Sequence, residues 1–361
     1  MRQNRLSEFL IAPLGSLYGV LAQTRTNFYR KDWLKSAKLG LPVVSIGNIT
    51  VGGTGKTPLV RFVSLALTEQ NHRVCILTRG YKRANPNGRV FVSDGEQILA
   101  DARTSGDEPF DLARKLLGIA AVIADKNRVE AGFWAKENLG ATAFVLDDGF
   151  QHLRLKRNLD VVTIDATNPF GNGKLLPAGI LREPLSALKR ADLIVLTRAD
   201  LSREISNLES EIKKYNPNCP VLLAKNEIKE LKPLAEFLNL PAKTRNARNL
   251  ENDSAFRIPH SALKAAAFCA LGNPAAFFRD LEKVGLKIVA AKSFPDHYAY
   301  RQADVEEIER KAREAGAEIL ITTAKDGVKL GKIKFGLPCF VAEAETVFED
   351  AEPLLNLLKS L

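Results

Sequence analysis

Residues 47–57 read Gly-Asn-Ile-Thr-Val-Gly-Gly-Thr-Gly-Lys-Thr, and this stretch decides the fold class of the chain. The run before it, 41–46, is short, apolar and β-branched, which is typical of a buried strand. The run after it, 58–67, begins with Pro58 and has helical apolar spacing. A glycine-rich turn between a strand and a helix lets backbone N–H groups converge on an anion, and the helix dipole adds positive charge. The stretch therefore predicts a phosphate-binding loop of the P-loop type.

Each residue of this loop has an expected role. Lys56 can reach the β- and γ-phosphates of a nucleotide, and the Thr57 hydroxyl can ligate Mg²⁺. The loop differs from the G-x-x-x-x-G-K-[ST] pattern at Thr50, where the pattern has glycine. The alternative is a glycine-rich turn with a surface lysine, but the flanking strand and helix favour nucleotide binding. The predicted nucleotide contacts are Thr50, Val51, Gly52, Gly53, Thr54, Gly55, Lys56 and Thr57.

A second motif, Ala-Phe-Val-Leu-Asp-Asp-Gly-Phe-Gln-His at 143–152, ends an apolar run in two carboxylates. P-loop folds hold Mg²⁺ with an aspartate at the C-terminal end of a buried strand. We therefore predict that Asp147 binds the metal or its water, the alternative being a turn or N-cap aspartate. The role of Asp148 stays open on this pattern.

Length and composition are those of an ordinary globular protein. The 361 residues exceed the usual size of one domain, so we expect two lobes. Hydrophobic residues make up 45% of the chain and charged residues 26%, which excludes a disordered protein. The four cysteines lie far apart without metal-binding spacing, which indicates reduced thiols in a cytosolic setting and no zinc site.

The N-terminal segment is basic and amphipathic. Residues 1–40 contain seven Lys and Arg against two acids, so they account for half of the net charge of +10. The apolar stripe between Leu6 and Leu21 is interrupted by Glu8, Pro13 and Gly15, and a bilayer-spanning helix needs about 20 apolar residues. A signal peptide is not indicated. A helix in a membrane interface and a helix packed on the protein's own core both fit the pattern. A nucleic-acid patch lacks a recognition motif.

Strand and helix signals alternate along the chain, which predicts an α/β fold. We expect a P-loop NTPase-like parallel sheet with helices on both faces, plus a second, smaller α/β lobe. A short hairpin at 89–99 interrupts the series, and 242–253 is expected to be a loop. The predicted domains are an amphipathic helix at 1–25, a P-loop core at 26–205 and a smaller α/β C-terminal domain at 206–361. The strand predictions are 41–46, 74–78, 120–124, 143–147, 160–164 and 192–197, then 264–271, 286–290, 317–322 and 339–342.

Further polar motifs follow the predicted strands or lie in loops, where α/β enzymes place their chemistry. Alone, each has a structural reading: Asp107 could be an N-cap, Arg128 and Arg182 surface cations, and His297 a structural histidine. Together with the loop, they are Thr78-Arg79-Gly80-Tyr81, Gly106-Asp107-Glu108-Pro109, Asp147-Asp148-Gly149-Phe150-Gln151-His152, Leu176-Pro177-Ala178-Gly179, Leu181-Arg182-Glu183-Pro184 and Phe294-Pro295-Asp296-His297-Tyr298.

In this order the motifs closely resemble the tetraacyldisaccharide 4′-kinase family, the lipid A 4′-kinases of Gram-negative bacteria. The resemblance covers nearly the whole chain and is strongest from Pro42 to Asp200. The family shares the threonine at the position of Thr50.

The resemblance implies ATP- and Mg²⁺-dependent phosphorylation of the 4′-hydroxyl of a tetraacylated glucosamine disaccharide 1-phosphate. It implies that Asp107 is the base, paired with His297. It also implies a peripheral protein on the cytoplasmic face of the bacterial inner membrane, attached by its N-terminal helix. From the residues alone we expect no nucleic-acid partner, and no obligate protein partner is evident. The implied metal ligands are Thr57, Glu108, Asp147 and Glu183. The implied substrate residues are Arg79, Tyr81, Arg128, Asp148, Gln151, His152 and Arg182.

The competing hypothesis is a P-loop nucleotide switch, such as a metallochaperone GTPase or a partition ATPase. Thr197-Arg198-Ala199-Asp200 loosely resembles a guanine-reading motif. The missing Cys/His cluster and the polar motifs of the second lobe argue against it.

Overall fold

A computed structural model describes residues 5–81, 83–238, 263–296 and 298–361, with side chains from residue 13 onward. The chain forms two compact units. Unit 1 consists of Met1–Arg79, Asn127–Lys225 and Phe348–Leu361, and unit 2 of Gly80–Lys126 and Asn226–Val347. Each unit thus combines segments that are distant in the sequence. The domain boundary expected near residue 205 stays a prediction.

Unit 1 is built on a parallel sheet with the strand order β8-β7-β6-β1-β5-β2. Its central strands are buried along their whole length, as expected for parallel strands covered on both faces. Their bounds are β1 Val43–Gly47, β2 Val74–Thr78, β5 Ala143–Asp147, β6 Leu159–Asp165 and β7 Leu193–Thr197, with β8 Val221–Pro233 starting in this unit.

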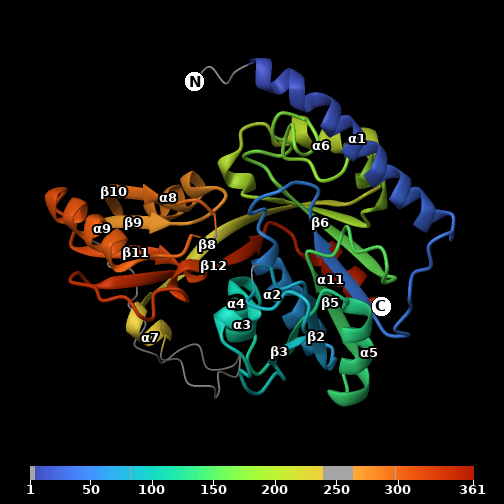
Figure 1. Cartoon of the computed structure of the whole chain (residues 1–361), viewed down its shortest axis with the longest axis horizontal. Helices are drawn as coiled ribbons and strands as arrows, with labels where there is room; N and C mark the ends of the chain where they lie inside the picture. Colours follow the sequence, from blue (N-terminus) through green and yellow to red (C-terminus); the bar gives the residue numbers. More distant parts are fainter. Residues whose placement is uncertain (1–4, 82, 239–262, 297) are drawn as a thin grey trace. The chain divides into compact units, whose positions relative to one another are not determined.

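Helices cover this sheet (Figure 1). The helix after the glycine-rich loop contacts β1, β5 and β2, and the C-terminal helix packs against it. The bounds are α1 Arg5–Arg30, α2 Lys56–Glu69, α5 Arg128–Asn138, α6 Ile205–Tyr215 and α11 Glu352–Lys359, with the short helices η1 Leu185–Arg190 and η2 Ala199–Leu201.

Unit 2 has a second sheet with the strand order β10-β9-β11-β12-β8 and an antiparallel pair, β3 with β4. Phe268, Leu320 and Val341 lie in its core. The strands are β3 Val90–Ser93, β4 Ala120–Ala124, β9 Lys264–Cys269, β10 Lys287–Ser293, β11 Ile319–Thr323 and β12 Cys339–Phe348. The helices are α3 Ala102–Ser105, α4 Asp107–Lys115, α7 Leu234–Leu238, α8 Pro274–Lys283, α9 Gln302–Glu314 and α10 Ala324–Gly327.

The structure confirms the α/β class and the parallel sheet behind the glycine-rich loop. At the hairpin expected at 89–99, an isolated antiparallel bridge joins Ser93 and Ile98, and Leu99 N donates to the Val92 carbonyl, while β3 pairs with β4 on its other side. Strand β8 is not among the predicted strands. The loop expected at 242–253 lies outside the described residues.

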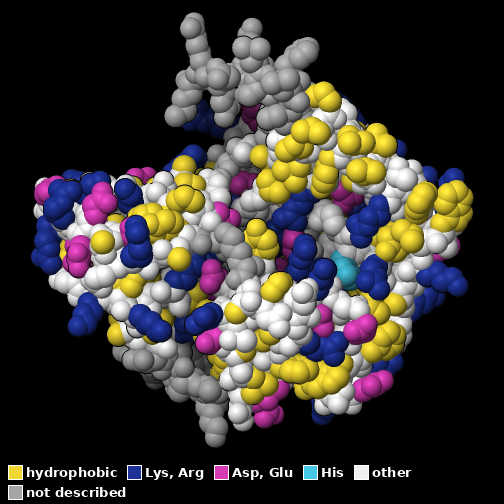
Figure 2. All heavy atoms as spheres, viewed as in Figure 1, with side chains coloured by type: hydrophobic (Ala, Val, Ile, Leu, Met, Phe, Trp, Pro, Cys, Tyr) yellow, Lys and Arg dark blue, Asp and Glu magenta, His cyan; other side chains and the backbone are white. Residues whose placement is uncertain are grey.

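Helix α1 continues through Pro13 and packs on a loop of unit 1. A Cβ added to Gly19 would lie 2.5 Å from Cδ1 of Leu175, and one added to Gly15 would lie 3.3 Å from the Leu175 carbonyl oxygen. Figure 2 shows hydrophobic side chains exposed along the course of this helix. No helix in the described part of the chain is long and apolar enough to cross a membrane.

Gly47, at the end of β1, has no room for a side chain. A Cβ there would lie 2.6 Å from both N and Cβ of Phe150. We predict that Gly47→Ala lowers the free energy of unfolding by about 1–3 kcal/mol, measured by urea denaturation. Gly53→Ala is the matched control, because its added Cβ meets nothing within 4 Å, and it should change stability by less than about 0.5 kcal/mol. Equal losses in the two variants would contradict this packing account.

Candidate active site

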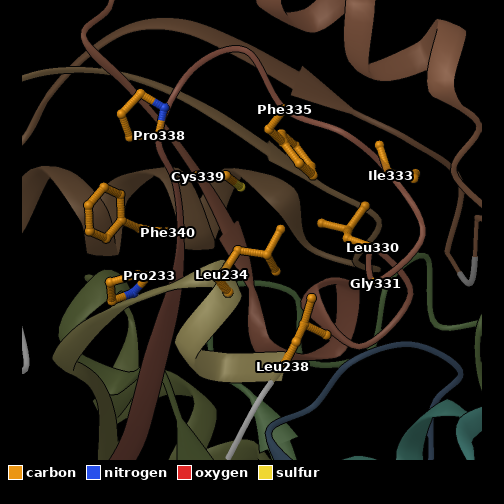
Figure 3. Close-up of a pocket in the computed structure, with 11 residues that line it drawn as sticks. Pro233, Leu234, Leu238, Leu330, Gly331, Ile333, Phe335, Pro338, Cys339 and Phe340 are labelled. Atoms are coloured by element: carbon orange, nitrogen blue, oxygen red, sulfur yellow. The ribbon is translucent and has the colours of Figure 1, made fainter.

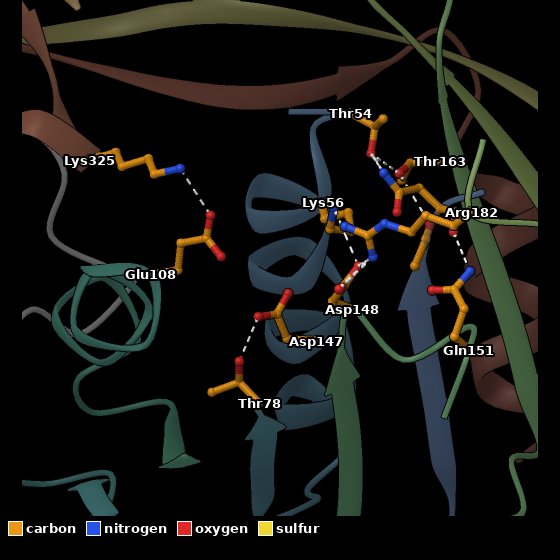
Figure 4. Close-up of polar contacts among 12 residues, drawn as sticks. Thr54, Lys56, Thr78, Glu108, Asp147, Asp148, Gln151, Thr163, Arg182 and Lys325 are labelled. Atoms are coloured by element: carbon orange, nitrogen blue, oxygen red, sulfur yellow. Dashed lines mark hydrogen bonds and ion pairs between the residues drawn. The ribbon is translucent and has the colours of Figure 1, made fainter. Parts of the chain in front are cut away.

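Buried hydroxyl groups fix the glycine-rich loop between β1 and α2. The Asn48 side-chain amide donates to Thr54 Oγ1 at 3.0 Å, and Thr54 Oγ1 lies 2.8 Å from Thr163 Oγ1 on β6. Thr163 Oγ1 also donates to the Gly47 carbonyl, and Thr197 Oγ1 at the end of β7 donates to the Thr54 carbonyl at 3.1 Å. These contacts appear in Figure 4 for Thr54 and Thr163. The loop is therefore attached to the neighbouring strands before any ligand binds.

The glycines give the loop its shape and leave its outer side open. Gly52 and Gly55 have positive φ angles of 116° and 78°, which a residue with a side chain rarely adopts. Nothing lies within 4 Å of a Cβ added at Gly52 or Gly53. The N-terminus of α2 follows directly, so backbone N–H groups and the helix dipole face this open space.

A second loop, residues 175–182, pairs with the start of the glycine-rich loop. Val51 N donates to the Ile180 carbonyl at 2.8 Å, and Arg182 N donates to the Ile49 carbonyl at 2.7 Å. This pairing places the Arg182 side chain at the carboxyl end of β5. There its Nη1 lies 2.8 and 3.0 Å from the two carboxylate oxygens of Asp148 (Figure 4).

Asp148 is the electrostatic centre of the site. Its carboxylate binds Arg182 and also lies 3.5 Å from Lys56 Nζ. Burial opposes ionisation, but Lys56 and Arg182 outweigh it and hold the pKa of Asp148 well below its usual range. Its φ of 52° lies in the left-handed region, which aspartate tolerates better than most residues.

Asp147 and Thr57 carry the oxygen atoms that were predicted to hold a metal. Asp147 ends β5 and is paired in register with Ile46 of β1, and its carboxylate accepts a hydrogen bond from Thr78 Oγ1 at 2.9 Å. Thr57 lies in the first turn of α2. Mg²⁺ prefers one or two hard oxygen ligands from the protein, with phosphates and waters completing its shell. This donor set fits Mg²⁺.

Glu183, another predicted metal ligand, has a different partner. Both of its carboxylate oxygens bind Arg190, at 2.8 and 3.0 Å. Within the described residues, no three His, Cys, Asp or Glu side chains form a group arranged to hold a metal.

The remaining predicted substrate residues of unit 1 are Arg79, Arg128, Gln151 and His152. Buried Arg128 donates to the Asp148 carbonyl at 3.1 Å, and burial lowers its pKa while Asp148 and Asp147 raise it. Gln151 donates to the Asn48 carbonyl at 2.8 Å (Figure 4). His152 comes next in the chain, and Arg79 is exposed after β2.

In unit 2, Asp107 and Glu108 begin α4 and lie opposite two lysines. Lys329 Nζ lies 3.5 Å from Asp107, and Lys325 Nζ lies 3.0 Å from Glu108 (Figure 4). Burial opposes the charge on Lys325, but Glu108 and Asp296 outweigh it and raise its pKa. His297 lies outside the described residues, so its predicted pairing with Asp107 stays a prediction.

Tyr81, also in unit 2, has an exposed side chain next to the turn before α4. A separate apolar pocket of about 360 Å³ lies between α7 and the segment 330–340 (Figure 3). None of the predicted site residues lines it. We therefore assign the site from the loop geometry and not from this pocket.

Sequence reasoning missed several residues that act on the site. Thr163 and Thr197 hold the glycine-rich loop, and Arg198 Nη1 donates to the Gly53 carbonyl at 3.0 Å. The 197–200 segment, which resembled a guanine-reading motif, thus contacts the phosphate-binding loop. Lys325 and Lys329 were also missed, although Lys325 comes three residues after the predicted strand 317–322.

The anchored loop, the helix N-terminus and the carboxylates at the end of β5 define a P-loop protein that binds a nucleoside triphosphate. The family model described as tetraacyldisaccharide-1-P 4′-kinase (LpxK) matches residues 7–361. The chain belongs to this family, and it is an ATP-dependent kinase with an α/β P-loop fold.

Curated relatives and a solved structure agree with this membership. Tetraacyldisaccharide 4′-kinase of Pelobacter propionicus is 37% identical over 98% of this chain and 92% of the relative. The enzyme of that name from Geobacter metallireducens is 38% identical over 97% of both chains. The crystal structure of "apo" form LpxK from Aquifex aeolicus in complex with ATP has a TM-score of 0.74 and 32% identity over 98% of both chains. The nucleotide-switch alternative is not favoured.

The lowered pKa of His152 predicts that the free energy of unfolding depends on pH. Burial, together with the nearby arginines, lowers this pKa from 6.5 to about 3. Between these values the unfolded state binds more protons than the folded state, so stability falls as the pH drops below about 6.5. We expect the wild type to lose up to about 1.4 kcal/mol more than His152→Gln for each pH unit below that value. Urea denaturation at pH 7.5 and 5.5 measures this difference, and parallel losses in the two proteins would refute it.

Proposed function

We propose that this protein transfers the γ-phosphoryl group of ATP to the 4′-hydroxyl of a tetraacylated glucosamine disaccharide 1-phosphate. The observation that carries the proposal is the anchored glycine-rich loop with Lys56, Thr57 and Asp147 around it, in a chain that matches the family from residue 7 to 361.

Phosphoryl transfer requires alignment and neutralisation of charge more than covalent catalysis. The loop N–H groups and Lys56 would bind the β- and γ-phosphates. Thr57 and Asp147 would hold Mg²⁺, which neutralises phosphate charge when bound. Glu108 and Glu183 stay as predicted further ligands. Arg182 can exchange one of its two contacts with Asp148 for a contact with an anionic substrate group. Its guanidinium has five N–H donors, so it can hold both partners at once.

The proposed base is Asp107, which would accept the proton of the attacking hydroxyl while His297 orients it. Asp107 begins α4, where the helix dipole stabilises a carboxylate, and Lys329 adds a cation 3.5 Å away. Arg79, Tyr81, Arg128, Gln151 and His152 would contact the acceptor.

We further propose that α1 attaches the protein to the cytoplasmic face of the inner membrane. Leu14, Leu17, Val20 and Leu21 expose more than half of their surface, an unusual gathering for a helix in water. Arg25 and Arg30 add positive charge toward the end of the same helix, and Lys31 follows it directly. This charge suits an anionic membrane surface.

The function is tested by measuring ADP release with purified protein, ATP and an acylated glucosamine disaccharide 1-phosphate. We expect release that depends on the acceptor and is much weaker with GTP. Nucleotide consumption without any dependence on the acceptor, or a preference for GTP, would refute the proposal.

Lys56→Ala should lower kcat by about 100- to 1,000-fold, because a charged contact to the transferred phosphate is lost. Its melting temperature should stay close to that of the wild type, since Asp148 keeps its pair with Arg182. Lys213→Ala, which removes an exposed lysine of α6, is the matched control and should keep full activity. Full activity of Lys56→Ala would rule out the assignment of the loop.

Asp107→Ala and His297→Ala should each lower kcat strongly with little change in the KM for ATP. If the two residues act as a unit, the double variant should be little worse than the more damaging single variant. Multiplicative losses would show separate roles for the two side chains.

Replacing Leu17 and Leu21 together by Glu should weaken binding to phospholipid vesicles by about tenfold or more, because apolar area is lost and charge is added. Both side chains are exposed, so the fold should stay intact. Sedimentation with vesicles measures the partition coefficient. An unchanged coefficient would mean that this face does not meet the membrane.

A further inference from the structure

Two lysines in and just after α10 lie opposite the two acids that begin α4, all within unit 2. Lys325 Nζ lies 3.0 Å from Glu108, and Lys329 Nζ lies 3.5 Å from Asp107. The first of these pairs, shown in Figure 4, spans 217 positions of sequence. Helices α4 and α10 are also in contact. The two ion pairs are therefore part of how these helices pack together.

Lys325 also joins two of the polar motifs. Its Nζ lies 3.1 Å from Asp296, in the 294–298 motif, while Glu108 belongs to the 106–109 motif. Both motifs fall in unit 2. The segment that carries the lysines, 323–329, is therefore the point where the polar motifs of this unit come together.

Asp326, between the two lysines in the sequence, is a fully buried carboxylate. Its Oδ2 accepts hydrogen bonds from Ala270 N and Thr323 Oγ1, both at 2.9 Å, and its Oδ1 lies 3.2 Å from Lys329 Nζ. A buried charge is costly unless it is paired and hydrogen-bonded, and Asp326 meets both conditions. The chain at the ends of β9 and β11 thus fixes this carboxylate, and the carboxylate fixes Lys329.

Lys329 is held at its charged end. Only 10% of its side chain is exposed, and its Nζ is within ion-pair distance of both Asp326 and Asp107. A lysine side chain in water samples many rotamers, so its charge has no fixed position there. Here the cation has one position, beside Oδ2 of the carboxylate that is proposed as the base.

The negative charge of Asp326 exceeds what the local turn requires. The side-chain oxygen of an asparagine could accept the same hydrogen bonds from Ala270 N and Thr323 Oγ1. An asparagine could not neutralise Lys329, however. The buried charge is therefore explained by Lys329, and the other partner of Lys329 is Asp107.

We infer that Lys329 is a positioning residue for Asp107, and that Asp326 acts through Lys329. The inference rests on the proposed function, in which Asp107 accepts the proton of the attacking hydroxyl. An ion pair on Oδ2 restricts rotation of the carboxylate, and proton transfer depends on its orientation. Lys329 needs no contact with either substrate for this role, so its loss should lower kcat and leave the KM values nearly unchanged.

The test measures kcat and both KM values with ATP and the acylated disaccharide acceptor. Lys329→Met keeps the length of the side chain and removes its charge, and we expect it to lower kcat by about 10- to 100-fold. The KM for ATP and the KM for the acceptor should change less than about twofold. Lys329→Arg restores the charge and should recover part of the loss. Wild-type kcat in Lys329→Met would overturn the inference.

A double variant tests whether Lys329 acts through Asp107. Adding Lys329→Met to Asp107→Ala should lower kcat by less than about twofold further, because the residue that Lys329 positions is already missing. Losses that multiply would show an independent role for Lys329 and would contradict the inference.

A second double variant separates positioning from stability. Lys329→Met leaves Asp326 as a buried charge without its cation, so its melting temperature should fall. Adding Asp326→Asn removes that charge and keeps the oxygen that accepts the two hydrogen bonds. We expect the melting temperature to recover while kcat stays low. Recovery of kcat together with the melting temperature would mean that the pair only stabilises the turn, and the inference would be wrong.

Lys283→Met is the matched control. Lys283 also pairs with an aspartate three residues earlier in unit 2, since its Nζ lies 3.3 Å from Asp280. Its kcat should equal that of the wild type, and a loss as large as that of Lys329→Met would overturn the inference. Failure of the wild type to phosphorylate the acceptor would instead overturn the proposed function, and the inference with it.

Discussion

The ion pairs of Asp148 with Lys56 and Arg182 are the interaction on which the site depends. They join three segments of unit 1: the end of β5, the first turn of α2 and the loop that pairs with the phosphate-binding loop. Without this carboxylate, two cations would repel each other across a partly buried space. Helix α1 packs on the same loop through Gly15 and Gly19. The helix proposed to meet the membrane is therefore in direct contact with the segment that carries Arg182.

A loop that binds phosphate through backbone N–H groups must hold its shape before the ligand arrives, because ordering it during binding would reduce affinity. In this chain the order comes from threonine hydroxyls. Thr163 within β6 binds the Thr54 side chain, and Thr197 at the end of β7 binds the Thr54 carbonyl. Arg198 fixes the Gly53 carbonyl from the same side and pairs with Asp165. These contacts are made to hydroxyl and carbonyl oxygens of the loop, whereas the Val51 N–H at its start donates to the Ile180 carbonyl.

Much of the core and the loop could be predicted from local patterns. The apolar run at 143–147 fixed both the strand and the position of Asp147, because a parallel strand buried on both faces is apolar throughout. Strand β8 was not predicted, because the charged residues Lys225, Glu227 and Lys229 interrupt the apolar pattern of its sequence. The contacts of Arg25 with Gln151 and of Lys325 with Glu108 join positions more than 100 residues apart. No local pattern shows such pairs, and only the folded chain brings them together.

The central claim is that the anchored loop directs phosphate to one particular hydroxyl of the acceptor. Proton–phosphorus correlation NMR of the purified glycolipid product tests it most directly. The account predicts one new phosphomonoester coupled to the proton at carbon 4′, with the 1-phosphate signal unchanged. A new phosphate at any other position, or a pyrophosphate at carbon 1, would contradict it.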